Sequence, residues 1–312
     1  MRVSVVIPSR DETLLADTVA AFLKLGADEI VVIDDASRKP VKREDLTDGN
    51  VVLVRNKRAG GPGACRAQGA ELATGDVLMW ADAHVFPTRV REFGEVAVQT
   101  QGQVTAAGSG LRDDREVIPW LQHGVIFLRD SKQEFAPYQI KWQPPKLTGV
   151  APVMGVCGGL YAMTRDAYKR MGGWPPTAAW GYNEQAFSWA AQLCNVPVLC
   201  DTETIARHLY RGAKCKLPAP YVTPHGLTVA NYYRVHRVLC EEETWRGYWK
   251  PLFDRVFARD ARFANASANH PEMTARHKAF QELRRITDYE WAQKINDTAL
   301  LEWFDKRKAV AA

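Results

Sequence analysis

The 312-residue sequence has few of the features that mark secreted or membrane proteins. Its six cysteines form no CxxC pair and are too sparse for a disulfide framework. Residues 1–8 enter an apolar strand directly, without a signal-peptide pattern. No apolar run approaches the roughly 20 residues that span a bilayer. We therefore expect a cytoplasmic protein with reduced thiols and no membrane partner.

Two common nucleotide-binding motifs are also missing. The loop Gly60-Gly-Pro-Gly63 is neither a Walker loop nor the dinucleotide fingerprint, which argues against an ATPase and a dehydrogenase. The net charge of +5 is too small to identify an anionic partner. The hydrophobic fraction of 46% is ample for a core.

Short apolar runs alternate with helical spacing in the first third of the chain. This alternation predicts an α/β protein with a Rossmann-like, mostly parallel sheet flanked by helices. Ligands of such sheets bind beyond the carboxyl ends of the strands. The expected strands are residues 3–7, 30–33, 51–54 and 77–81, and the second expected helix spans about 64–73.

The pattern changes twice further along. It weakens from about residue 85 to 150, which predicts a connecting region. Long, charged helices with many aromatic residues predominate from residue 228 onward. We therefore predict a nucleotide-binding domain at 1–227 and a helical C-terminal region at 228–312, a candidate for acceptor binding.

Three side chains are candidates for a metal site. Asp82 and His84 follow the expected strand at 77–81 and are separated by one small residue. A carboxylate oxygen and an imidazole nitrogen at this spacing can reach one divalent cation. His208, after an apolar stretch and a polar turn, could supply a third ligand, although a lone histidine is more often structural.

Polar residues at the ends of the first two strands are candidates for nucleotide contacts. Asp34 and Asp35 could accept a hydrogen bond from a base or a ribose, or could simply shape a turn. Pro8, Ser9 and Arg10 end the neighbouring strand and should line the same crevice.

The glycine-rich loop and the helix after it suit a diphosphate. Gly61 allows close backbone approach, the helix N-terminus favours anions, and Arg66 can clamp phosphate. The alternative is an ordinary glycine-rich turn.

A further segment could act on the sugar. Trp180-Gly-Tyr-Asn183-Glu184 opens an expected helix, and Glu184 either acts as a base over the sugar or complements the helix dipole. Gly158 and Gly159 would let backbone pack closely against a sugar.

Taken together, these segments resemble glycosyltransferases of the GT-A fold. Residues 5–12, 31–37 and 61–67 resemble the nucleotide-binding half of family-two glycosyltransferases. The later segments are more similar to the polypeptide N-acetylgalactosaminyltransferases. The segments that match their motifs, in the same order, are Asp82-Ala-His84, Gly158-Gly-Leu-Tyr-Ala162, Trp180-Gly-Tyr-Asn-Glu184, Arg207-His-Leu-Tyr-Arg211 and Asn231–Glu243.

The resemblance implies a metal-dependent enzyme that moves a sugar from a UDP-sugar to an acceptor hydroxyl. Asp82, His84 and His208 would hold Mn²⁺ (or Mg²⁺), and residues 1–227 would form the GT-A domain. One of Asp34 and Asp35 would contact the uracil. The nucleotide would lie near Arg66, beside the sugar contacts Gly158, Gly159 and Trp180.

The catalytic position and the acceptor stay open. The family's glutamate falls on Asn183 if spacing is kept, with Glu184 one place later, so both inversion and retention are possible outcomes. Basic residues interleave with aromatics in the helical region, which suggests a hydroxymethylated base in DNA as acceptor. The alternative is a solvated helical cap on an O-glycosyltransferase acting on proteins, peptides or small molecules. Outside this class, we considered a sugar-nucleotide pyrophosphorylase and a sugar-nucleotide-binding protein without catalysis.

Overall fold

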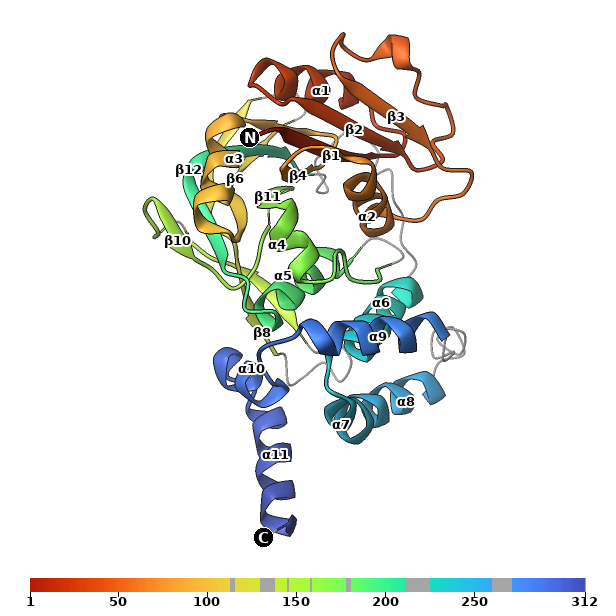
Figure 1. The fold of residues 1–312 in the computed structure, drawn as a ribbon, viewed down its shortest axis with the longest axis vertical. Coiled ribbons are helices and arrows are strands. Elements are labelled where there is room, and N and C mark those ends of the chain that lie inside the picture. The colour runs from red at the N-terminus through yellow and green to blue at the C-terminus, as the bar shows by residue number, and fades with distance from the viewer. Residues whose placement is uncertain are drawn as a thin grey trace.

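The structure is a computed structural model. It describes residues 1–112, 116–129, 138–144, 146–157, 159–177, 181–210, 225–259 and 271–311. A twisted sheet forms its upper half and helices form its lower half in Figure 1. The strands are β1 (Val3–Ser9), β2 (Glu29–Asp34), β3 (Val51–Arg55), β4 (Val77–Ala81), β5 (Val85–Pro87), β6 (Gln103–Leu111), β7 (Val117–Gln122), β8 (Val125–Leu128), β9 (Gln139–Trp142), β10 (Val150–Pro152), β11 (Leu160–Thr164) and β12 (Val198–Leu209).

The predicted parallel sheet is confirmed in the first third of the chain. The ten-stranded sheet has the order β10-β12-β6-β11-β4-β1-β2-β3, with β5 beside β12 and β7 beside β6. β1 to β4 are mutually parallel where they pair, and β11 runs antiparallel between β4 and β6. The carboxyl ends of β1, β2 and β4 therefore share one edge, as the candidate site requires.

The interpretation of residues 85–150 as a connecting region was wrong. This stretch contains α3 (Arg91–Thr100) and β6, which lies inside the main sheet between β11 and β12. All nine residues of β6 are buried. Its sequence is rich in Ala, Gly and Ser, small residues that fit a strand buried on both faces. It therefore has few of the β-branched residues by which a strand is usually predicted from sequence.

Helices cover both faces of the sheet. Alternate β1 residues face opposite sides, so Val5 packs with α1 and α3, whereas Val6 packs with α2, α4 and α5. The helices are α1 (Leu15–Lys24), α2 (Pro62–Leu72), α4 (Arg165–Arg170), α5 (Asn183–Leu193), α6 (His225–Leu239), α7 (Glu242–Thr244), α8 (Lys250–Arg259), α9 (Pro271–Leu283), α10 (Asp288–Ile295) and α11 (Thr298–Ala311), and Trp245–Trp249 form a π-helical turn.

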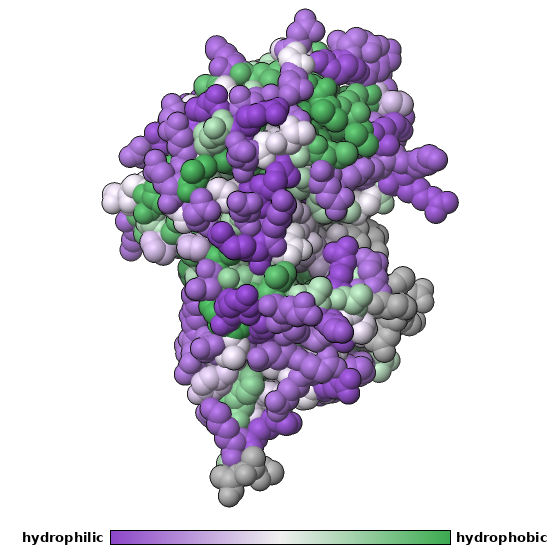
Figure 2. Space-filling view, viewed as in Figure 1, coloured by the Kyte–Doolittle hydropathy of each residue, from purple (hydrophilic) through white to green (hydrophobic). Residues whose placement is uncertain are grey.

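The C-terminal helices turn their large aromatic side chains inward. Tyr233, Trp245 and Trp249 are buried. They belong to the same apolar cluster as Phe187 and Trp189 of α5. The face in Figure 2 is accordingly mostly hydrophilic over these helices. The helical character predicted beyond residue 228 is confirmed, and the domain boundary at 227 stays a prediction.

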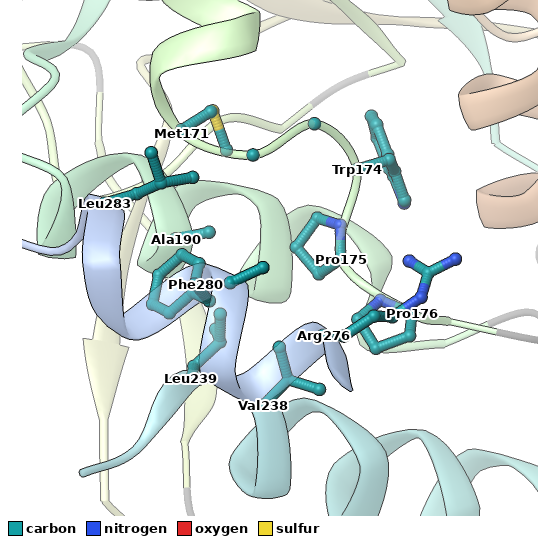
Figure 3. A pocket seen from close by; sticks show the side chains of 13 residues that line it. Met171, Trp174, Pro175, Pro176, Ala190, Val238, Leu239, Arg276, Phe280 and Leu283 are labelled. Atoms are coloured by element: carbon teal, nitrogen blue, oxygen red, sulfur yellow. The ribbon is translucent and has the colours of Figure 1, made fainter. Parts of the chain in front are cut away.

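An apolar cavity of about 100 Å³ lies where these helices meet the rest of the chain. Figure 3 shows Leu239 of α6 and Phe280 of α9 on one side of it and Trp174 and Pro175 on the other. The loop that carries Trp174 is thus in contact with the C-terminal helices.

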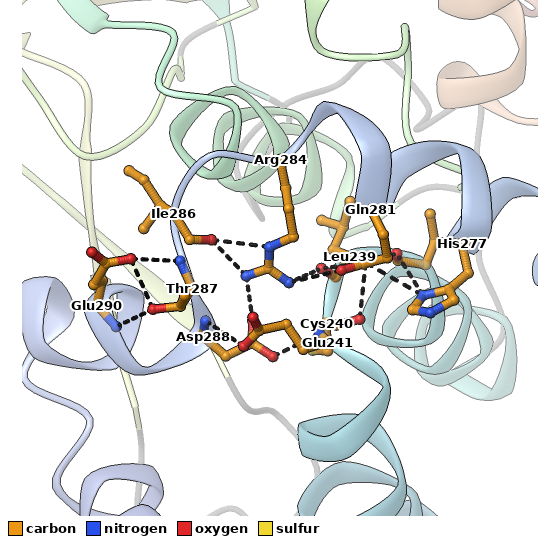
Figure 4. Close-up of polar contacts among 11 residues, drawn as sticks. Leu239, Cys240, Glu241, His277, Gln281, Arg284, Ile286, Thr287, Asp288 and Glu290 are labelled. Atoms are coloured by element: carbon orange, nitrogen blue, oxygen red, sulfur yellow. Dashed lines mark hydrogen bonds and ion pairs between the residues drawn. The ribbon is translucent and has the colours of Figure 1, made fainter.

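A buried polar network fastens α6, α9 and α10 together (Figure 4). Arg284 donates to Asp288 Oδ1 at 2.9 Å and to the backbone oxygens of Leu239 and Ile286. Asp288 and Glu241 each accept a bond from the other's backbone N–H. One guanidinium therefore satisfies the carbonyl group at the end of α6 and a carbonyl group in the connection between α9 and α10.

Among the described residues, no helix is both long and apolar enough to cross a membrane. The five described cysteines, at 65, 157, 194, 200 and 240, are free thiols.

We expect Arg284→Ala to lower the free energy of unfolding by about 3 kcal/mol, because it leaves the buried Asp288 carboxylate without its cation. Guanidinium chloride titration followed by tryptophan fluorescence measures this loss. The neighbouring Arg285 is exposed, so Arg285→Ala serves as the control and should change stability by less than about 0.5 kcal/mol. Equal losses in the two variants would contradict the proposed anchoring role.

Candidate active site

The three predicted metal ligands converge at the carboxyl edge of the sheet. Asp82 follows β4, His84 precedes β5, and His208 lies in β12 beside β5 through its pairing with Val85. One candidate ligand atom from each lies within 4.8 Å of the others. His208 Nε2 is 3.2 Å from Asp82 Oδ2, although the two residues are 126 positions apart.

His208 does not follow a turn, as its flanking residues had suggested. It lies within one long strand, β12, whose pairing with β6 shifts register between Asp201 and Ile205. The polar residues Thr202, Glu203 and Thr204 occupy this irregularity. A bulge places polar residues in a strand much as a turn does, which explains the error.

Gly159 lets two of the candidate ligands, His208 and Asp82, approach each other. Its φ of +75° lies in the left-handed region. A Cβ at this position would lie 2.7 Å from His208 Cδ2 and 3.1 Å from Asp82 Oδ2. Only the absence of a side chain leaves room for both ligands.

Arg66 of α2 connects the candidate metal ligand Asp82 to Glu184. Its side chain is 3% exposed, donates from Nη2 to Asp82 Oδ1 at 2.6 Å, and donates from Nη1 to Glu184 Oε1 at 2.9 Å. The guanidinium lies over the rings of Tyr161 and Trp174, at 5.5 and 5.4 Å from their centroids. These contacts stabilise a buried cation through paired carboxylates and aromatic faces.

The charges in this cluster stabilise one another. Burial by itself would raise the pKa of Asp82, but Arg66 and then His208 outweigh it and hold that pKa well below its usual range. Burial would also lower the pKa of Arg66, whereas Tyr161, Glu184 and Asp82 raise it. Both groups are therefore charged at neutral pH.

Asp34 and Asp35, at the end of β2, accept hydrogen bonds from the loop that follows β2 and from the glycine-rich loop before α2. Asp34 is buried and accepts bonds from Arg55 and from the backbone of Ser37 and Val41. Burial would raise the pKa of Asp34, but these hydrogen bonds lower it. Its carboxylate is thus engaged in local structure, and its contact with a base stays a prediction.

Asp35 holds the glycine-rich loop. Its two carboxylate oxygens accept the backbone N–H groups of Gly60 at 2.7 Å and Gly61 at 2.9 Å. Gly61 has a φ of +86° and immediately precedes α2, which begins at Pro62 rather than at residue 64 as predicted. The loop, the helix N-terminus and Asp35 form one unit, and a base contact by Asp35 also stays a prediction.

The end of β1 lines the same edge. Pro8 and Ser9 pair with Ile33 and Asp34 of β2, and Arg10 follows directly. Ser9 Oγ is buried and has no hydrogen-bond partner within the described part of the chain. A buried hydroxyl without a partner at this edge suits a polar ligand.

The two candidate catalytic residues differ in position. Asn183 is 1% exposed and lies against the start of α2, where a Cβ on Gly63 would come within 2.4 Å of its Oδ1. Glu184 is 28% exposed and faces Arg66 and the Tyr161 hydroxyl. Glu184 is therefore the residue of the two that a ligand could reach. Gly158 and Trp180, the other predicted sugar contacts, lie outside the described residues.

Sequence reasoning did not single out three residues of the site. Glu12 contacts His84, and Tyr161 and Trp174 frame Arg66. Glu12 could have been found because it follows the end of β1 by only three residues. Tyr161 and Trp174 gave no local signal, since apolar aromatics at such spacings usually indicate core.

The chain is similar to known proteins. Residues 4–149 match the family Glycosyl transferase family 2. Human polypeptide N-acetylgalactosaminyltransferase 10 is 26% identical over 270 residues, which cover 77% of this chain and 42% of that protein. N-acetylgalactosaminyltransferase 6 of Drosophila melanogaster is 25% identical over 238 residues, or 69% of this chain and 34% of that protein. The chain thus spans less than half the length of these curated relatives.

A solved structure shows the same fold. GalNAc-T7 with UDP, GalNAc and Mn²⁺ superposes with a TM-score of 0.71 at 22% identity, covering 96% of this chain and 58% of that chain. The resemblance noted in the sequence is confirmed: the chain has the GT-A fold and is similar to the polypeptide N-acetylgalactosaminyltransferases.

We expect Gly159→Ala to destabilise the protein more than Gly149→Ala. Both glycines have positive φ, but a Cβ on Gly149 meets no atom within 4 Å. Gly149→Ala should cost about 1 kcal/mol for backbone strain, and Gly159→Ala about 1 to 3 kcal/mol more for crowding. Urea unfolding measures both losses. Equal losses would mean that His208 and Asp82 move aside freely.

Proposed function

We propose that the protein transfers a sugar from a UDP-sugar to an acceptor hydroxyl, with Mn²⁺ held by Asp82, His84 and His208. The observation that carries this proposal is the convergence of these three side chains beside the Arg66–Glu184 ion pair. The names of the relatives, and the UDP, GalNAc and Mn²⁺ in the GalNAc-T7 structure, make UDP-N-acetylgalactosamine the first donor to test.

The residues present fit a transition metal better than magnesium. One carboxylate and two imidazoles form a mixed oxygen and nitrogen donor set, whereas Mg²⁺ prefers oxygen ligands in near-ideal octahedral geometry. Three protein ligands leave coordination positions for phosphate oxygens and water. Gly159 keeps the space between His208 and Asp82 free of a side chain.

Different residues of the chain would then hold the cation, bind the nucleotide and orient the carboxylates. A bound cation would offset the negative charge that develops on the departing diphosphate. Ser9 and the N-terminus of α2 would bind the nucleotide, because a buried hydroxyl without a partner and a helix N-terminus favour a polar, anionic ligand. Arg66 would hold the carboxylates of Asp82 and Glu184 in fixed directions through its two ion pairs.

The position of Glu184 favours retention of configuration. Its Oε1 already accepts hydrogen bonds from Arg66 Nη1 at 2.9 Å and from the Tyr161 hydroxyl at 3.5 Å, so the carboxylate is oriented toward these two donors. In the proposed reaction, the bond from the sugar C1 to the acceptor oxygen forms as the bond from C1 to the phosphate oxygen breaks. The acceptor's proton passes to the leaving phosphate oxygen. Glu184 positions the sugar without taking that proton.

For the acceptor, we propose a polypeptide, because the human relative is named a polypeptide N-acetylgalactosaminyltransferase. Its serine and threonine side chains supply the hydroxyl groups that the proposed reaction needs. The alternative, a hydroxymethylated base in DNA, relied on aromatic residues of the C-terminal helices. Tyr233, Trp245 and Trp249 are buried, and Arg237 is paired with Glu242. These side chains are therefore poorly placed to stack on a base or track a phosphate backbone.

We expect UDP-N-acetylgalactosamine to bind only when Mn²⁺ is present, as measured by isothermal titration calorimetry with and without the metal. His208→Ala should abolish the binding that is seen with Mn²⁺, because it removes one metal ligand. His277→Ala is the control, because its side chain is 10% exposed against 11% for His208 and lies in the C-terminal helices. Metal-independent binding would support the rival of a sugar-nucleotide-binding protein without catalysis, and no binding of any UDP-sugar by folded protein would reject the donor.

Incubation with donor, Mn²⁺ and serine- or threonine-containing peptides should release UDP and give an α-linked product, identified by the anomeric proton coupling in NMR. A β-linked product would instead assign Glu184 as the base of an inverting reaction. Duplex DNA with hydroxymethylated bases is the comparison acceptor. Transfer to it, with binding that weakens steeply as salt rises, would overturn the peptide assignment.

A further inference from the structure

Glu12 contacts His84, one of the three candidate metal ligands. It precedes α1, its side chain is 2% exposed, and its Oε2 lies 3.0 Å from His84 Nδ1. Its other oxygen, Oε1, accepts the backbone N–H of Thr13 at 3.1 Å. A buried carboxylate is thus held between the start of a helix and one ring nitrogen of a candidate metal ligand.

We infer that Glu12 is a positioning residue that selects which nitrogen of His84 is free to bind a cation. A neutral imidazole carries one proton, and a carboxylate at Nδ1 favours the tautomer that is protonated there. The lone pair is then on Nε2, on the far side of the ring from Glu12. Such carboxylate–histidine pairs also make the ligating nitrogen more basic. This inference rests on the proposed metal site.

A hydrogen bond from α1, the helix that follows Glu12, supports this role. Thr18 of α1 is buried, and its hydroxyl donates to the backbone oxygen of Ala83 at 3.0 Å. Ala83 lies between the two ligands Asp82 and His84. The N-terminal part of α1 therefore holds both the backbone of the ligand turn and the ring of one ligand.

This arrangement also places the metal ligands next to the nucleotide side. Glu12 follows Ser9 and Arg10, the residues at the end of β1 that line the nucleotide edge. One short segment thus borders both parts of the proposed donor site. A purely structural role, in which Glu12 only caps α1, would predict no effect on the tautomer or on metal affinity.

The test compares Glu12→Ala and Glu12→Gln with the native chain, without donor or acceptor. Long-range ¹H–¹⁵N NMR of metal-free, histidine-labelled protein reads the tautomer, with His84→Gln identifying the His84 signals. Electron paramagnetic resonance of free Mn²⁺ gives the dissociation constant. Glu29→Gln is the matched control, because Glu29 is also a buried carboxylate, bound to Ser4 and Thr74 at the opposite edge of the sheet.

We expect His84 to be protonated at Nδ1 in the native protein and largely at Nε2 in Glu12→Ala. The Mn²⁺ dissociation constant of Glu12→Ala should rise about 10- to 100-fold, and Glu12→Gln, which keeps an acceptor oxygen, should fall in between. Glu29→Gln should lose stability without changing the dissociation constant.

Two negative results would have different meanings. An unchanged tautomer and unchanged Mn²⁺ affinity in folded Glu12→Ala would overturn the positioning role and leave the proposed function intact. Failure of the native chain to bind Mn²⁺ would overturn the metal site itself, and the inference with it.

Discussion

The buried guanidinium of Arg66 is the interaction on which the arrangement of the site depends. A charge with 3% of its side chain exposed is costly to bury unless it is paired and hydrogen-bonded. Arg66 meets that requirement with two carboxylates from distant parts of the chain, Asp82 after β4 and Glu184 in α5. Because both partners are also candidate site residues, the same ion pairs that stabilise the charge hold the turn at Asp82 next to the start of α5 at Glu184.

The two faces of the sheet contribute different parts of this arrangement. From one face, Glu12, which precedes α1, and Thr18 of α1 hold the turn that carries Asp82 and His84. From the other face, α2 supplies Arg66, and the loop after α4 supplies Trp174. The ring of Trp174 stacks on Phe187 of α5 at 4.1 Å, and its loop borders the apolar cavity against α6 and α9 (Figure 3). The C-terminal helices thus contact the loop that covers Arg66.

The C-terminal helices also show how one pattern supports two interpretations. Arginines interleaved with tyrosines and tryptophans are typical of surfaces that bind nucleic acid, but the same pattern occurs in helices that pack large aromatics inward and solvate the rest. Here the aromatic side chains fill a core, and several basic groups are paired with acids of the same helices, as Arg246 is with Glu242 and Lys250 with Asp254. Burial separates the two interpretations, and periodicity does not.

The sequence by itself determined the elements whose signals are local. Apolar runs such as Val77–Ala81 predicted buried strands, and the Asp82–His84 spacing predicted two ligands of one cation, because both depend on residues next to one another. Only the tertiary structure decided the rest. The pairing of β12 with β5 brings His208 to Asp82 across 126 positions, the burial of small residues makes β6 a central strand, and the packing of α1 places Glu12 against His84. These contacts depend on sheet register and packing between distant segments, which no local pattern encodes.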